Sequence, residues 1–105
     1  MIDIGSDKVV QVIYLSREGT AARSELEGFI DNLNVDEKAE LVAIAWIGRG
    51  SFDVAEFAHA RTIAVQEATT PTSSYLCGMP HLAENLEAGL DALGVDVTGA
   101  EEDFL

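Results

Sequence analysis

The chain contains the segment Trp46-Ile47-Gly48-Arg49-Gly50-Ser51-Phe52, in which one predicted helix ends and the next begins. Gly50 can take the left-handed backbone conformation that ends many helices. Ser51 can then cap the following helix, with Asp53 in its first turn near the positive end of the helix dipole. Every residue from 41 to 47 is apolar, and a helix that is apolar all round lies inside a core. We therefore predict that the helix ending at Arg49 is the centre of a helical domain.

Capping signals mark two helices before this corner. Ser24 with Glu27 forms a capping box for one helix, and Asn34 with Glu37 does the same for the central helix. The first of these helices carries one apolar stripe at positions i, i+3, i+4 and i+7, which is made of Leu26, Phe29, Ile30 and Leu33. This spacing predicts a helix that packs one face against the core.

The N-terminal run has two interpretations. Ser6 can cap a helix that ends near Gly19 and carries Val9, Val10, Val12, Ile13, Tyr14 and Leu15. Its β-branched residues would also suit a strand. Because no partner strand is visible elsewhere, an isolated strand would leave its backbone groups unpaired. The helix is therefore favoured.

After the corner we expect a helix from Phe52 to about Ala68, a short one ending at Gly78, and a last one from Pro80 to Gly94. Residues 95–105 form an acidic tail with an apolar tip. The chain has no internal repeat and no long linker. Residues 1–105 are thus predicted to be a single all-α domain, a small bundle of four to six helices joined by short capped corners.

The charge balance is strongly acidic, with six Lys and Arg against 19 Asp and Glu and a net charge of −13. Such a surface repels phosphate groups, so we expect neither nucleic-acid binding nor attachment to an anionic membrane. The acidity suits solubility, a salty cytoplasm, or a negative face offered to a basic protein partner.

One cysteine excludes an internal disulfide and suits a reducing compartment. The first residues contain no basic region followed by an apolar signal core, and no stretch has the ~18 consecutive apolar residues of a membrane span. We predict a cytoplasmic protein.

Several segments resemble a bacterial family known as domain of unknown function 3775. The resemblance covers about residues 26–94 and rests on Phe29-Ile30-Asp31, Asp36-Glu37, Trp46-Ile47-Gly48-Arg49-Gly50, Tyr75-Leu76-Cys77-Gly78-Met79-Pro80 and Leu86-Glu87-Ala88-Gly89-Leu90. It implies a helical fold and no particular activity.

A metal site has one weak candidate. Glu56 and His59 have the Glu-x-x-His spacing of carboxylate-bridged metal bundles, which also need a second such pair and two further glutamates. The chain offers only His81 and Glu84, in the reverse order. We therefore predict no metal and no other cofactor, with Glu56 and His59 facing solvent.

Catalysis also has little support. Cys77 with His81 as its base would make a nucleophile, but a free cysteine beside a leucine is more often part of a core. Gly48 and Gly50 do not form a phosphate-binding loop, because the chain has neither a Walker pattern nor a Rossmann fingerprint around them. We predict no catalytic residue.

Arg49 is one of few cations and has three possible roles. It can stabilise the carbonyl end of its helix, pair with a carboxylate at the corner, or hold an anionic ligand beside Trp46 and Tyr75. In the third case Trp46, Arg49 and Tyr75 form a ligand site.

The leading hypothesis for function is a non-enzymatic interaction or regulatory module that self-associates as a homodimer. The first helix has apolar residues over too wide an arc for one small core, so we expect the dimer face to include Ile13. The alternative is a ligand-binding or metal-dependent protein that uses the Trp46/Arg49/Tyr75 region or the Glu56/His59 pair.

Overall fold

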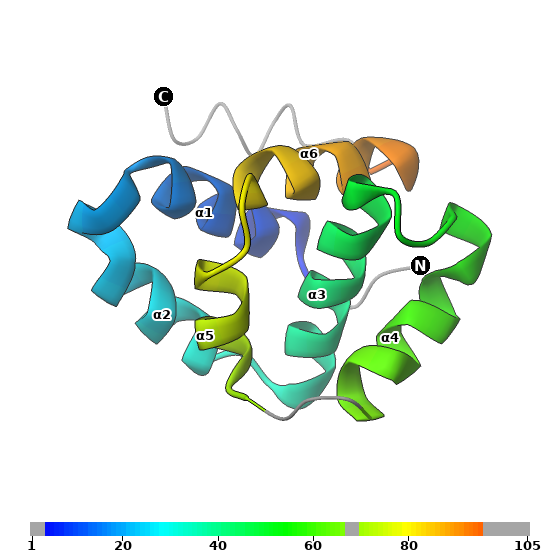
Figure 1. The fold of residues 1–105 in the computed structure, drawn as a ribbon, viewed down its shortest axis with the longest axis horizontal. Coiled ribbons are helices and arrows are strands. Elements are labelled where there is room, and N and C mark those ends of the chain that lie inside the picture. Colours follow the sequence, from blue (N-terminus) through cyan, green and yellow to red (C-terminus); the bar gives the residue numbers. More distant parts are fainter. Residues whose placement is uncertain (1–3, 67–69, 96–105) are drawn as a thin grey trace.

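The computed structural model describes residues 4–66 and 70–95. Within these ranges the chain forms helices and no strand (Figure 1). The elements are α1 (Ser6–Arg17), η1 (Gly19–Ala22), α2 (Arg23–Asp31), α3 (Val35–Arg49), η2 (Val54–Glu56), α4 (Phe57–Gln66), α5 (Thr72–Cys77) and α6 (Leu82–Ala92), where η denotes a 3-10 helix. The prediction of a small all-α bundle with four to six helices is confirmed.

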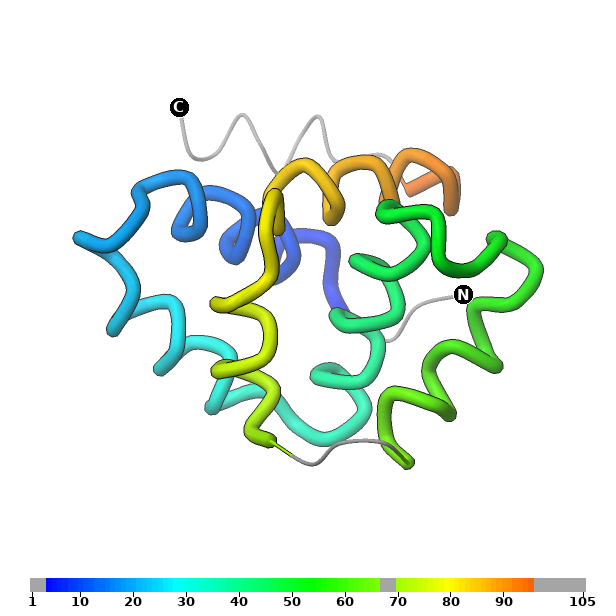
Figure 2. Tube along the Cα trace, in the orientation of Figure 1, coloured from blue at the N-terminus to red at the C-terminus, as the bar shows by residue number. Residues whose placement is uncertain are grey.

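Helix α3 runs through the middle of the molecule, as predicted. It packs against α6 on one side and α4 on another, while α2 lies beside α5 and α1 beside α6 (Figure 2). Residues 41–45 of α3 are all buried. This helix is the most buried element because its apolar residues surround its axis and therefore contact neighbours on several sides.

The ends of α3 are fixed by local signals that the sequence displays. The Asn34 side chain accepts the Glu37 N–H (2.8 Å), and the Glu37 carboxylate accepts the Asn34 N–H (3.0 Å). At the other end Gly50 has φ 91°, in the left-handed region, and the Ser51 N–H bonds to the Trp46 carbonyl (2.9 Å). Both predicted ends of α3 are thus confirmed.

Three other predicted helix starts are wrong. Helix α2 begins at Arg23 after a 3-10 turn, without a side-chain cap from Ser24. After the corner, Asp53 rather than Ser51 precedes the next turn. Helix α6 begins at Leu82 and not at Pro80, because His81 takes a left-handed conformation (φ 57°, ψ 37°) that is not helical.

The N-terminal run is a helix, and the strand interpretation is wrong. Helix α1 is preceded by Gly5 and has no side-chain cap, so the expected cap by Ser6 is also wrong. Its apolar residues Val9, Val10, Val12, Ile13 and Leu15 are buried, each at most 5% exposed. The monomer therefore accommodates the wide apolar arc of α1.

Two glutamates of α3 connect distant segments. Glu40 is fully buried, and its carboxylate accepts the Ile4 N–H (3.0 Å) and an Arg61 N–H from α4 (2.8 Å). One turn earlier, the Glu37 carboxylate binds Lys8 of α1. Together they join α1 and α4 to α3.

Among the helices within residues 4–66 and 70–95, none has the length and apolar character to cross a membrane. The acidic tail predicted for residues 95–105 lies outside the described residues except for Val95.

Candidate functional site

Three aromatic side chains contact one another where α3, the following corner and α5 meet. The Trp46 Nε1–H donates to Tyr75 Oη (2.8 Å), and the two rings meet edge to face with centroids 6.5 Å apart. On its other side Trp46 stacks on Phe52, with centroids 5.6 Å apart. We call Trp46, Phe52 and Tyr75 the aromatic surface.

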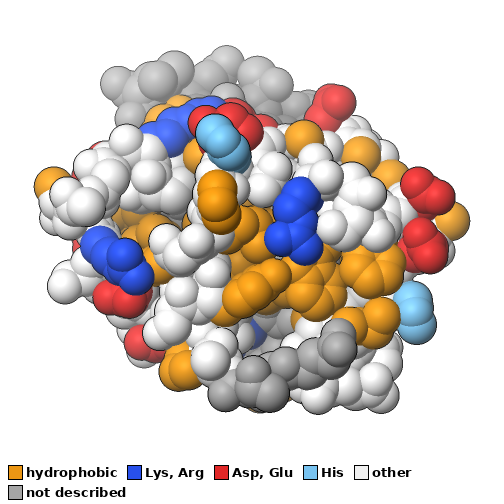
Figure 3. Space-filling view, in the orientation of Figure 1, with side chains coloured by type: hydrophobic (Ala, Val, Ile, Leu, Met, Phe, Trp, Pro, Cys, Tyr) orange, Lys and Arg blue, Asp and Glu red, His pale blue; other side chains and the backbone are white. Residues whose placement is uncertain are grey.

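The aromatic surface is open to solvent. Tyr75 is 39% exposed, and Trp46 and Phe52 are partly buried against the core. Figure 3 shows a hydrophobic area in the middle of the face in view, with a basic side chain against it and acidic side chains mostly toward the edges of the view. The sequence prediction that Trp46 and Tyr75 lie together thus agrees with the structure, while Phe52 was missed because its role depends on the path of the corner.

Arg49 is the last residue of α3, where its charge lies near the carbonyl end of the helix. Its Nε–H donates to Ser51 Oγ (3.0 Å) across the corner, and its side chain is exposed. The structure therefore supports the helix-end role. Its contact at the corner is made to a hydroxyl rather than to a carboxylate.

Glu56 and His59 are both exposed and occupied by other contacts. The Glu56 carboxylate accepts the Asp53 N–H (2.9 Å), which fixes the turn before α4. The His59 ring meets Phe52 edge to face at 6.1 Å. In the described part of the chain, no three His, Cys, Asp or Glu side chains are grouped as metal ligands.

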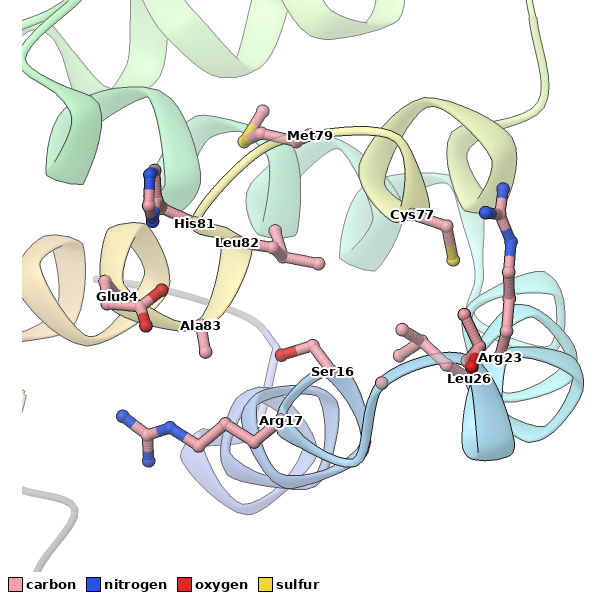
Figure 4. A pocket seen from close by; sticks show the side chains of 12 residues that line it. Ser16, Arg17, Arg23, Leu26, Cys77, Met79, His81, Leu82, Ala83 and Glu84 are labelled. Atoms are coloured by element: carbon pink, nitrogen blue, oxygen red, sulfur yellow. The ribbon is translucent and has the colours of Figure 1, made fainter.

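Cys77 and His81 do not form a nucleophile and base. Figure 4 shows Cys77 Sγ directed toward Leu26, on the other side of Leu82 from the His81 ring. Burial raises the pKa of the Cys77 thiol, and the negative charge of Glu27 raises this pKa further, against the opposing effect of Arg23. A catalytic thiol needs a lowered pKa, so Cys77 has the opposite character.

A cavity of about 480 Å³ opens beside Cys77. It lies between the end of α1, η1 and the start of α2 on one side and the corner from α5 to α6 on the other (Figure 4). Apolar and polar side chains line it together: Ser16, Arg17, Thr20, Arg23, Leu26, Cys77, Met79, His81, Leu82, Ala83 and Glu84, with Gly19.

Two arginines lie at this cavity, and both have acidic neighbours. Arg17 pairs with Glu87 of α6. The Arg23 Nε is 3.7 Å from a Glu27 carboxylate oxygen, which is too long for a hydrogen bond. No local sequence pattern indicates these arginines, because the cavity joins residues 16–26 with residues 77–84 through long-range contacts.

Ile13 was expected at a dimer face, but only 1% of it is exposed and it belongs to the core. The monomer covers this side chain, so its predicted place in an interface is wrong. The homodimer itself stays a prediction and has to use other residues.

The model of the family described as Protein of unknown function (DUF3775) matches residues 23–95. The matched region contains α2 to α6 and most of the residues described above. No curated protein and no solved structure matches the chain.

Proposed function

We propose that this chain, which belongs to the DUF3775 family, is a non-enzymatic interaction module that self-associates through the aromatic surface. The observation that carries this proposal is the contact of Trp46 with both Phe52 and Tyr75 on an open face. Tryptophan and tyrosine dominate the energetics of many protein interfaces. A surface built from them is therefore suited to binding a protein.

The aromatic rings are held before any partner arrives. The hydrogen bond to Tyr75 and the stacking on Phe52 restrict the Trp46 ring on two sides. Binding then costs less conformational entropy, because the side chains have few alternative positions to lose.

The charge distribution of the chain is compatible with binding of a second copy of the chain at the aromatic surface. Each chain carries a net charge of −13, so two copies repel one another over most of their surfaces. The hydrophobic area in Figure 3 has acidic side chains away from its centre. Two copies that meet at an area without carboxylates avoid part of this repulsion, and added salt should strengthen the contact by screening the remaining charges.

The test is the molar mass in solution, measured by light scattering on a gel-filtration peak. We expect a dimer for the native chain in ~0.15 M salt or above. Tyr75→Glu adds a negative charge to the aromatic surface and should give a monomer. Val35→Glu makes the same change at a residue 67% exposed at the opposite end of α3, and it should leave the dimer intact.

Two outcomes would refute this proposal. A native chain that stays monomeric at high protein concentration has no self-association to explain. A dimer that survives Tyr75→Glu uses another surface. Trp46 is the single tryptophan of the chain, so a shift of its fluorescence on dilution gives a second, independent reading of the same contact.

Ligand binding at Trp46, Arg49 and Tyr75 is the second candidate function. Trp46 and Arg49 both lie in the last turn of α3, where Trp46 donates to Tyr75 Oη and the exposed Arg49 donates to Ser51 Oγ. A ligand here would change Trp46 fluorescence without changing the molar mass, which distinguishes it from self-association.

A further inference from the structure

We propose that the cavity between η1 and the corner from α5 to α6 binds a small organic acid, with an apolar body and a single carboxylate. This site is separate from the aromatic surface and does not depend on the proposed self-association. Its volume of about 480 Å³ falls within the usual range of small-molecule sites, which is about 300–1,000 Å³.

The charges of the lining favour an anion over a cation. The chain has six Lys and Arg and 19 Asp and Glu. Two of those six cations, Arg17 and Arg23, line the cavity, whereas only one acidic residue, Glu84, does so. The lining thus carries more basic than acidic side chains, with Glu87 and Glu27 beside the two arginines but outside the lining.

Arg23 is the group that holds the carboxylate. Its distance of 3.7 Å to Glu27 leaves its N–H groups free to make closer bonds, and the pair is more than one-third exposed at both partners. Exposed pairs of this kind stabilise a protein by only about 0–1 kcal/mol. A planar carboxylate can therefore bind the guanidinium with two parallel hydrogen bonds at little cost.

The remainder of the lining fits an apolar body. Figure 4 shows the side chains of Leu26, Cys77 and Leu82 around one space, with Met79 above them in the view. The raised pKa of Cys77 keeps its thiol neutral, which suits an apolar neighbour. A second anionic group is disfavoured, because Glu84 and Arg17 with its partner Glu87 lie toward the other end.

The alkylation rate of Cys77 can report whether a ligand occupies the cavity. It is the single cysteine of the chain, and its sulfur faces the cavity (Figure 4). Octanoate at millimolar concentration should slow alkylation of Cys77 by N-ethylmaleimide. Octan-1-ol and octylammonium have the same body with a neutral or a positive head, and both should protect the thiol much less.

Variants of Arg23 test the anchor. Arg23→Gln should weaken octanoate binding at least about tenfold, as expected for loss of a charged hydrogen-bond donor. Arg23→Lys keeps the charge and should retain part of the binding. Lys38→Gln is the control, because it removes a cation of α3 that lies outside the cavity and should leave octanoate binding unchanged. Each variant is compared with its own ligand-free rate, since Arg23 also affects the thiol pKa.

Several results would overturn the proposal. These are an unchanged alkylation rate with octanoate, equal protection by octan-1-ol, and unchanged octanoate affinity in Arg23→Gln. Chemical shifts of Leu26, Met79 and Leu82 on octanoate addition give a readout that does not rely on the thiol. Shifts that instead cluster at Trp46 and Tyr75 would also contradict the cavity site.

Discussion

Gly48 of α3 lies directly against Gly89 of α6. A Cβ atom added to Gly48 would stand 2.8 Å from the Gly89 nitrogen and 1.7 Å from the carbonyl oxygen of Asn85. A Cβ on Gly89 would in turn stand 2.1 Å from the Ile44 carbonyl oxygen. The two helix backbones are therefore in contact, and the absence of side chains at both positions sets how closely α6 packs on the central helix.

Gly48→Ala should lower the free energy of unfolding by at least about 2 kcal/mol, because an added methyl group forces two backbones apart. The control is Gly28→Ala in α2, where an added Cβ meets nothing within 4 Å. This second change should raise the stability by about 0.5–1 kcal/mol, since alanine favours a helix over glycine. Chemical denaturation measures the free energy of unfolding of each variant. If Gly48→Ala changes this free energy by the same amount as Gly28→Ala, the close contact of α3 with α6 does not restrict the side chain at Gly48.

Glu40→Ala should destabilise the protein by about 2–4 kcal/mol, because it removes the buried acceptor for Ile4 and Arg61. Glu25→Ala provides a comparison, since Glu25 is an exposed glutamate of α2. It should change stability by less than about 0.5 kcal/mol. Hydrogen exchange should also show faster opening of α4 in the Glu40 variant than in the native chain.

The contribution of Glu37 to stability should depend on pH. The hydrogen bond from Lys8 lowers the pKa of Glu37, the Asn34 N–H lowers it further, and burial opposes both. A lowered pKa in the folded state stabilises the protein above the ordinary glutamate value of about 4.3, and this stabilisation is lost as the pH falls through the folded pKa.

Glu37→Gln should therefore be less stable than the native chain at pH 7, and the difference should shrink as the pH falls below about 4. Denaturation curves at a series of pH values test this prediction. Asp36→Asn removes a carboxylate from the same turn without touching the Lys8 pair. A difference for Glu37→Gln that stays constant with pH would contradict the pKa shift.

Cys77 should react slowly with iodoacetamide at pH 8 compared with a cysteine in an unfolded peptide. Burial and the charge of Glu27 raise its pKa, so less of the reactive thiolate is present at this pH. The rate should continue to rise above pH 9. Glu27→Gln should lower the pKa and speed the reaction, and an unchanged rate would show that Glu27 does not influence the thiol.

The candidate sites differ in how far the sequence could reveal them. Trp46 and Tyr75 were predicted to lie together, and they are joined by a hydrogen bond across 29 positions. In the sequence this pair belongs to only one of the three possible roles of Arg49, and the contact itself depends on the packing of α5 beside α3. Arg23 was not foreseen, because nothing near it in the sequence indicates that Cys77 and Leu82 lie across a cavity.

The sequence by itself determined the class of fold and both ends of α3. Asn34, Glu37 and Gly50 act on residues within three or four positions, so their effect is readable without knowing the rest of the structure. The apolar run of residues 41–47 likewise placed this helix in the core.

Only the tertiary structure decided where α2 and α6 begin, whether α1 keeps an exposed apolar face, and where a cavity opens. Local caps are weak, at about 1 kcal/mol each, and packing overrides them. Met79 and Leu82 are both buried, and His81 between them takes a left-handed conformation at the corner. The start of α6 follows from this corner, and its close approach to α3 depends on Gly48 and Gly89, which no local pattern could pair.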